Sequence, residues 1–344
     1  MPNLRLALTI LLSCRLLSAQ TAEDAQAQYN RGVEFWYGNG VPQDYVEAAN
    51  WFRKAADQGF AEAQYRLGQM LAIGQGLAQN DAEAASWYRK AAEQGVMLAQ
   101  HNLGTMYVFG RGVAKDYAEA VKWFRKAADQ GFVGAQHNLG VSYRDGQGVP
   151  QDFQEALAWF HKAADQGYAE AQFALALMYS DGQGVPKDLA EAAAWLRKSA
   201  DQGFASAEFN MGVLCVVGVG VPQDWAQGVQ WYRKAAESGL PQAQGALKIV
   251  ADGGYAPAQH VLGMTYENGW GSVKLDAEAV RWYRKAAELG YPPAQYDLGR
   301  MLADGRGAPK NEAEAKEWFQ RAAEKGMAEA KTKLKALDAA AGPK

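Results

Sequence analysis

Tryptophan recurs along this chain at a fixed interval of 36 residues, and no other feature limits the fold as strongly. The first series comprises Trp51, Trp87, Trp123, Trp159, Trp195 and Trp231. The interval returns once more between Trp282 and Trp318. A period of this length is typical of a solenoid, in which each repeat contacts only its neighbours. The 344 residues are therefore expected to form one array of repeats rather than two or three globular domains.

Each repeat contains two helical patterns separated by a glycine loop. In the second repeat, Ala63, Leu67 and Leu71 fall on one face of a helix. The loop typically reads Gly-x-Gly-Val-Pro-x-Asp, and a glycine suits the left-handed position that ends a helix. The Asp is expected to cap the second helix, in a reciprocal capping box with a residue three positions later. The expected caps are Asp44, Asp116, Asp152, Asp188 and Asp224, with Glu47, Glu119, Glu155, Glu191 and Gln227 as their partners.

The full motif resembles a known repeat family. The clearest copy is Ala99-Gln100, Leu103-Gly104, Tyr107, Gly110, Gly112-Val113, Asp116, Glu119-Ala120, Trp123, Lys126-Ala127-Ala128 and Gly131. This pattern resembles the Sel-one-like repeat (SLR) family, a relative of the tetratricopeptide repeats, over about residues 25–330. The resemblance implies an all-α fold, a right-handed α-solenoid superhelix of antiparallel helix pairs. It does not by itself imply a chemistry.

The repeat pattern divides the chain into segments. Residues 20–242 hold six repeats, and residues 258–329 hold two more. Between them, residues 243–257 form a truncated repeat with room for a single helix. Losing one helix of a pair predicts either a kink in the superhelix or a deletion absorbed in packing, and both remain open. Residues 330–344 are expected to supply a Lys-rich capping helix and a tail.

The first 19 residues have the layout of a secretory signal. Arg5 gives a basic start, an apolar stretch follows, and Leu17-Ser18-Ala19 offers small residues for cleavage. Two alternatives stay open: a lipoprotein anchored at Cys14, and a buried first helix. The sequence therefore predicts an exported protein, periplasmic or secreted. No apolar run reaches the ~18 residues of a membrane span.

The composition and the missing motifs argue against nucleic-acid binding, a disulfide framework, catalysis and metal binding. A formal net charge of -3 removes the main electrostatic argument for nucleic-acid binding. Two cysteines are too few for a disulfide framework, and Cys215 falls in a core column. No Gly-x-Ser-x-Gly, Ser-x-x-Lys or His-Glu-x-x-His signature occurs. We expect no catalytic residues, no cofactor and no metal site. His101 and His137 lie on neighbouring repeats, but neither a carboxylate nor a cysteine shares their column.

One column of the first helix suggests a binding surface. By resemblance to tetratricopeptide repeats, it lines the concave face. It contains Tyr29, Tyr65, His101, His137, Phe173 and Phe209, with His260 and Tyr296 beyond the truncated repeat. Trp36, Tyr37 and Phe109 follow on the same face. The alternative is that these rings pack between repeats as part of the core. The face becomes acidic at Asp145, Asp181 and Asp304, which favours a partner with one apolar and one basic end.

A second column is assigned to packing. Gln28, Gln64, Gln100, Gln136, Gln172 and Gln259 are expected to hydrogen-bond backbone between repeats.

These patterns favour an exported, non-enzymatic scaffold that binds a protein or peptide partner in the concave groove. One alternative is a cell-wall or β-lactam-acting hydrolase of the SLR type, although the Ser-x-x-Lys arrangement is missing. Another is a homo-oligomer that uses the groove on itself. Partner identity and oligomeric state do not follow from the sequence.

Overall fold

The computed structural model describes residues 24–340, with side chains as far as residue 337. The expectations for residues 1–19 lie outside the described part of the chain. Every regular element within it is a helix. The chain divides into two compact units, unit 1 and unit 2, whose described parts are residues 24–166 and 167–340.

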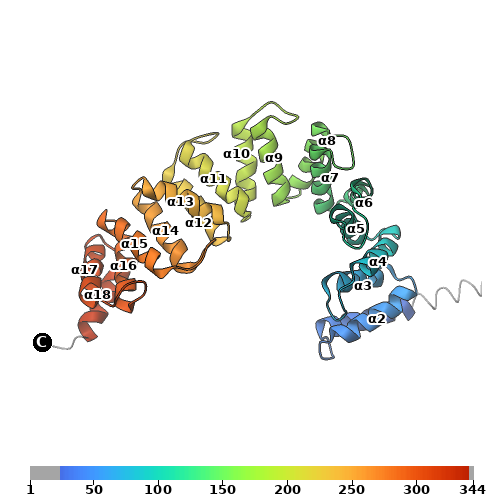
Figure 1. The fold of residues 1–344 in the computed structure, drawn as a ribbon, viewed down its shortest axis with the longest axis horizontal. Coiled ribbons are helices and arrows are strands. Elements are labelled where there is room, and N and C mark those ends of the chain that lie inside the picture. Colours follow the sequence, from blue (N-terminus) through green and yellow to red (C-terminus); the bar gives the residue numbers. More distant parts are fainter. Residues whose placement is uncertain (1–23, 341–344) are drawn as a thin grey trace, which may run out of the picture. The chain divides into compact units, whose positions relative to one another are not determined.

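Each repeat consists of an A helix followed by a B helix of about equal length (Figure 1). In the first unit, the A helices are residues 24–37, α3 (Ala61–Ile73), α5 (Met97–Phe109) and α7 (Val133–Asp145). Their B helices are α2 (Tyr45–Asp57), α4 (Asp81–Glu93), α6 (Tyr117–Asp129) and α8 (Phe153–Ala164). We number these repeats 1 to 4.

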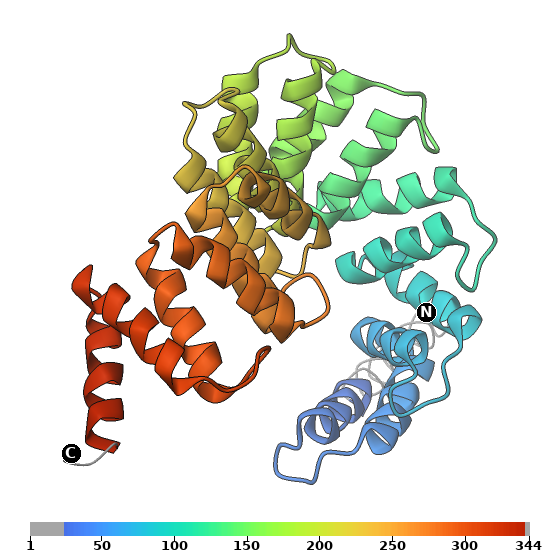
Figure 2. The same ribbon diagram turned by 60° about the vertical axis from the view of Figure 1, so that its left-hand side comes forward.

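The second unit continues the pattern (Figure 2). The A helices of repeats 5 to 8 are α9 (Ala169–Asp181), α11 (Ala205–Val217), α14 (Ala256–Asn268) and α16 (Pro292–Asp304). The B helices are α10 (Leu189–Ala200), α12 (Trp225–Glu237), α15 (Asp276–Glu288) and α17 (Glu312–Glu324). Helix α18 (Ala328–Ala340) follows the last repeat. Within each unit, an A helix packs on its own B helix, and most B helices pack on the next A helix.

The truncated repeat is the single helix α13 (Pro241–Asp252). It packs against both α12 and α14, and α12 also contacts α14. The stack of helices therefore continues through this segment of the second unit. A kink at this point stays a prediction.

The expected caps form, but only in one direction. The side chain of Asp44 accepts hydrogen bonds from the backbone N–H groups of Val46 and Glu47 at the start of α2. Each of the other four expected Asp caps accepts a hydrogen bond from the N–H group three positions later. The sequence also predicts a reciprocal hydrogen bond, from the backbone N–H of the capping Asp to the side chain three positions later. This prediction is wrong. The backbone N–H of Asp44 donates instead to the carbonyl oxygen of Phe35 at 3.0 Å, which ties the loop to the A helix.

In repeats 2 and 8, the glutamate at the position of the expected box forms an ion pair with the preceding repeat. Glu83 occupies this position in repeat 2, and its carboxylate accepts a hydrogen bond from Arg53 of repeat 1 at 2.8 Å. Glu314 accepts from Arg284 of the preceding repeat in the same way. These two glutamates therefore link neighbouring repeats, whereas Glu119 pairs with Lys122 of its own helix.

The glutamine column also joins repeats, as the sequence predicts. The side-chain amide of Gln100 donates to the carbonyl oxygen of Ala92 in the preceding B helix at 3.0 Å. Its own oxygen accepts a hydrogen bond from Gln130 at 2.8 Å. The same bond to the preceding B helix is made by Gln64, Gln136 and Gln295, and Gln259 makes it to Ala251 of α13. Each buried amide thus satisfies a carbonyl near the end of a helix.

Candidate functional site

The aromatic column of the A helices takes part in the core. Tyr65 lies 5.9 Å from Tyr88 of its own B helix, measured between ring centroids. His101 lies 5.7 Å from Phe124 and 4.8 Å from Phe132. The corresponding contacts of Tyr29, His137, Phe173 and Phe209 are with Phe52, Phe160, Phe204 and Tyr232. All six column residues are half-buried. The rings pack as the alternative interpretation expects, and their contact with a partner stays a prediction.

The exposed apolar surface lies at the ends of the A helices. Tyr37, Ile73 and Phe109 are the last residues of the A helices in repeats 1, 2 and 3, with exposed fractions of 58%, 61% and 69%. We call these three side chains the end row. A left-handed glycine such as Gly74, with φ of 73°, follows each of them and turns the chain away from the helix. The end row therefore presents three large apolar side chains on consecutive repeats of one unit.

Trp36 does not belong to the exposed surface. Its ring lies 5.2 Å from Tyr45 and 6.3 Å from Phe52, both on α2. The side chain is half-buried and packs against the core of repeat 1. Of the three residues predicted beyond the aromatic column, Tyr37 and Phe109 are exposed and Trp36 is half-buried. Their contact with a partner stays a prediction.

The acidic character predicted for this face is weakened in repeat 4. Asp145 ends α7 at the position of the end row, and its carboxylate accepts two hydrogen bonds from the guanidinium of Arg144, at 2.7 and 3.1 Å. This ion pair offsets the negative charge. In unit 1, the end row is therefore an apolar feature and not the apolar half of a charge gradient.

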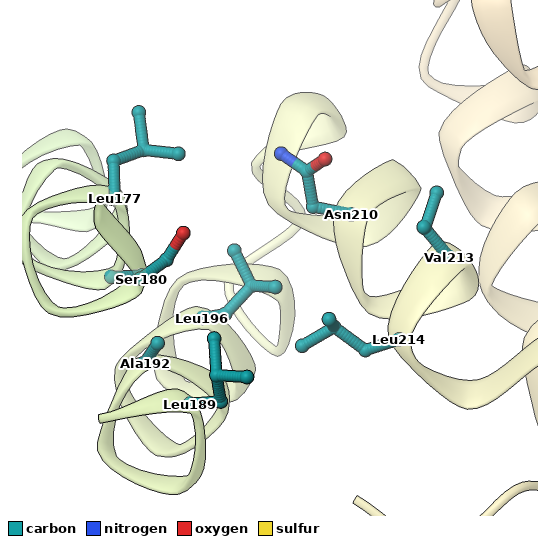
Figure 3. Close-up of a pocket in the computed structure, with 9 residues that line it drawn as sticks. Leu177, Ser180, Leu189, Ala192, Leu196, Asn210, Val213 and Leu214 are labelled. Atoms are coloured by element: carbon teal, nitrogen blue, oxygen red, sulfur yellow. The ribbon is translucent and has the colours of Figure 1, made fainter. Parts of the chain in front are cut away.

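Beside the end row, a hollow recurs between the A helices of consecutive repeats. In repeat 3 it has a volume of about 280 Å³ and lies between α5 and α7, with Phe124 of α6 in its wall. In repeat 2 it lies between α3 and α5 and is bordered by Tyr88. The second unit has equivalent hollows at repeats 5 and 8 (Figure 3 shows repeat 5). Repeats 2, 3, 5 and 8 thus offer similar depressions on the A-helix side.

A glycine in the A helix makes room for the ring beside each hollow. A Cβ atom on Gly140 would lie 2.5 Å from the ring of Phe160. The same close approach occurs at Gly32, Gly68, Gly104, Gly212, Gly263 and Gly299. Repeat 5 alone departs, with Ala176 at the glycine position and Leu196 at the ring position. Sequence reasoning missed this pairing, although both columns follow the 36-residue interval.

In repeat 7 the hollow is filled by a polar network. Glu267 is only 7% exposed, and it accepts hydrogen bonds from the hydroxyl of Tyr283 at 2.8 Å and from Arg300 at 2.7 Å. Arg306, in the loop that follows α16, donates to the second carboxylate oxygen of Glu267 at 3.0 Å. Asp297 accepts a hydrogen bond from Arg300 at 3.3 Å, and its other oxygen lies 2.8 Å from the Nε2 atom of His260. Burial, reinforced by these carboxylates, raises the pKa of Tyr283. The network cross-links repeats 7 and 8.

Two further groups considered for chemistry are His101, which is half-buried, and Cys215, which is buried. Burial lowers the pKa of His101 from 6.5 to about 4, and its Nδ1 atom has no hydrogen-bond partner. The thiol of Cys215 is fully buried and donates to the Oε1 atom of Gln227 at 3.2 Å. Burial also raises the pKa of this thiol, which disfavours the reactive thiolate.

Residues 24–340 contain neither a candidate metal site nor a candidate membrane span. No group of three or more His, Cys, Asp and Glu side chains there is arranged to hold a metal ion. Within the same residues, no helix has the length and apolarity needed to cross a bilayer.

Comparison with known proteins agrees with this architecture. The family model described as Sel1 repeat matches eight segments, residues 25–60, 61–96, 98–132, 133–168, 169–204, 205–240, 256–291 and 292–327. No curated protein matches the chain. Among solved structures, the chain is similar to a protective antigen of uropathogenic Escherichia coli that displays an SLR fold. That match has 38% identity and a TM-score of 0.61, and covers 95% of this chain and 68% of the other. It is also similar to a Sel1 repeat protein from Oxalobacter formigenes, with 33% identity, a TM-score of 0.52, and coverage of 95% and 90%.

Proposed function

Since this chain belongs to the Sel1 repeat family, we propose that it is a non-catalytic scaffold that binds a segment of another protein along the A-helix side of unit 1. Sel1 repeats form helical scaffolds suited to protein–protein interaction, so the partner is a protein or peptide. The proposal adds where on this chain the partner binds.

The end row carries the proposal. Tyr37, Ile73 and Phe109 are each more than half exposed, on three successive repeats. Large apolar side chains in such a row are costly to leave in water and supply the anchors of protein interfaces. The hollows of repeats 2 and 3 lie beside the row and offer depressions for the partner's own side chains. The half-buried column residue His137 lines one of them.

We further propose that the protein is exported. The signal-like residues 1–19 support this location. The similar E. coli protein is described as a protective antigen, which is compatible with it. Secretion of a fusion of residues 1–30 to a reporter, abolished when Leu6 to Leu12 are replaced by polar residues, is the expected result. A reporter retained inside the cell would contradict export.

The hydrolase alternative has a simple test. Purified protein is expected to leave the β-lactam nitrocefin unchanged. Turnover by the purified protein would overturn the non-catalytic assignment.

The binding surface is tested by replacing the end row. Asn268 occupies the same position in repeat 7, so asparagine is compatible with this helix end. The variant Tyr37→Asn/Ile73→Asn/Phe109→Asn is therefore expected to fold, as checked by circular dichroism. Used as bait in extracts of the source cells, it should lose a partner that the unaltered chain retains. The control is Val46→Asn, because Val46 is similarly exposed (55%) but lies on B helix α2. Equal capture by all three baits would contradict the proposed surface.

A further inference from the structure

In repeat 1, an aromatic side chain occupies the position at which other repeats have a hollow. The indole of Trp36 packs there against Tyr45 and Phe52, with ring centroids 5.2 and 6.3 Å apart. Repeat 1 therefore fills its own hollow with an aromatic ring supplied from the end of its A helix. Repeat 7 fills the equivalent space with Glu267 and its polar network.

Repeat 5 has smaller side chains at the three equivalent positions, and they leave the hollow open. Ser180, Leu189 and Leu196 stand where repeat 1 has Trp36, Tyr45 and Phe52. The result is a pocket of about 120 Å³ between α9, α10 and α11. An apolar cavity of about 150 Å³ is known to hold a benzene ring, so the pocket is close to the size of one aromatic ring.

The lining of this pocket is almost wholly aliphatic. It is formed by Ala176, Leu177, Leu189, Ala192, Leu196, Val213 and Leu214, with only Ser180 and Asn210 as polar residues. Figure 3 shows Leu196 and Leu214 turned toward each other across the pocket, with Ser180 and Asn210 on facing helices. The hollow of repeat 3, by contrast, includes Thr105, Asn138 and Gln147. Repeat 5 therefore offers the most favourable site for an apolar group.

An acidic group stands at the edge of the pocket. Asp181 follows Ser180 at the end of α9 and is exposed. Its carboxylate accepts a hydrogen bond from the Ser180 hydroxyl at 3.2 Å. Among the described residues no cation is paired with it, whereas the equivalent Asp145 is paired with Arg144. The charge of Asp181 is therefore available to a cationic group on a ligand.

We infer that the repeat 5 pocket binds one aromatic side chain, of the tryptophan type, from a partner segment that carries a lysine or arginine beside it. The ring takes the place that Trp36 occupies in repeat 1, and the cation lies near Asp181. This inference rests on the proposed scaffold function and names a chemical class of partner for it. It concerns the second unit, whereas the test of the proposed function alters only the first.

The probe is the capped dipeptide acetyl-Trp-Lys-amide, with acetyl-Ser-Lys-amide as its matched control. Leu and Val methyl groups of the full chain are labelled with ¹³C and followed by NMR during titration. The Trp dipeptide should shift the methyl resonances of Leu177, Leu196 and Leu214 in a saturable manner, and the Ser dipeptide should not. Shifts absent from these methyls, or equal with both dipeptides, would overturn the inference.

Two variants localise the binding. Ser180→Trp places the indole of repeat 1 in the repeat 5 pocket and should weaken binding of the Trp dipeptide at least about tenfold. Val213→Gln places a polar side chain in the wall of the pocket. Gln69 occupies the same position in repeat 2, so glutamine is compatible with the helix. This variant should also weaken binding of the Trp dipeptide. Binding unchanged in both folded variants would overturn the site.

The role of charge is tested separately. Acetyl-Trp-Lys-amide should bind several-fold more tightly than acetyl-Trp-Glu-amide, and Asp181→Asn should remove that preference. A preference that persists in the variant would overturn the basic part of the inference. Failure of the dipeptide to bind, combined with loss of a partner in the end-row variant, would remove the pocket inference and leave the proposed function standing.

Discussion

Gly104 lies so close to Phe124 that a Cβ atom at Gly104 would come within 2.6 Å of the ring. The A and B helices of repeat 3 thus approach each other at a point where only hydrogen fits. Repeat 5 has Ala176 and Leu196 at these positions, so the added methyl group there is accompanied by the loss of the ring.

This relationship predicts a strongly non-additive pair of substitutions. Gly104→Ala alone should lower the free energy of unfolding by about 1–3 kcal/mol through overpacking. In the background of Phe124→Leu the same substitution should cost much less, because the leucine leaves space for the methyl group. Urea unfolding of the four proteins measures the coupling. Additive costs would show that the two positions do not share this constraint.

The repeat architecture predicts that position along the chain changes the effect of equivalent mutations. Trp123 and Trp318 are similarly buried in repeats 3 and 8. Trp123→Ala should cost about 3–5 kcal/mol, because repeat 3 has neighbours on both sides. Trp318→Ala should cost less overall, because the last repeat can unfold alone. Equal losses in urea unfolding would argue against a quasi-linear array.

Burial of His101 predicts a defined dependence of stability on pH. Its native pKa of about 4 lies below the ordinary value of 6.5. Between these values the unfolded chain binds a proton that native His101 does not, so the free energy of unfolding falls as the pH drops through this range. The full effect is up to about 3 kcal/mol.

The variant His101→Phe isolates this contribution, because phenylalanine occupies the same position at Phe173 and Phe209. Between pH 7 and 4.5, its stability should fall less than that of the unaltered chain. The control is Val108→Ala on α5, which changes no titratable group and should retain the original slope. Parallel pH profiles for all three proteins would contradict the burial of a neutral His101.

The environment of Cys215 predicts an inert thiol. In a chain beginning at Gln20, Cys215 is the sole cysteine. Iodoacetamide should label it at least about a hundredfold more slowly in the native protein than in urea, because labelling requires opening of α11. Mass spectrometry over time measures both rates. Similar rates would place the thiol at an accessible site.

The repetitive sequence predicted much of the fold because each signal is local. The Asp caps, the closing glycines and the glutamine column depend on residues a few positions apart, and all appear as expected. The reciprocal capping box failed because the backbone N–H of Asp44 is used by Phe35, a contact between loop and A helix.

The candidate site was less predictable, because it depends on contacts between helices. Whether an aromatic residue on an A helix faces a partner or its own B helix depends on the residue opposite, as the contact of His101 with Phe124 illustrates. The network around Glu267 joins residues of two repeats and a loop, and interrupts the periodicity. The end-row residue Ile73 belongs to a column that contains both polar and apolar residues. The sequence pattern therefore does not show whether Ile73 is exposed, and the structure does.

Site-specific photo-crosslinking tests the central claim most directly. A benzophenone amino acid placed at Ile73, in the end row, is compared in the source cells with the same group at Val46 on α2. The account predicts a discrete crosslinked partner from position 73 and none from position 46. Crosslinks confined to position 46, or the same products from both positions, would contradict binding along the A-helix side of unit 1.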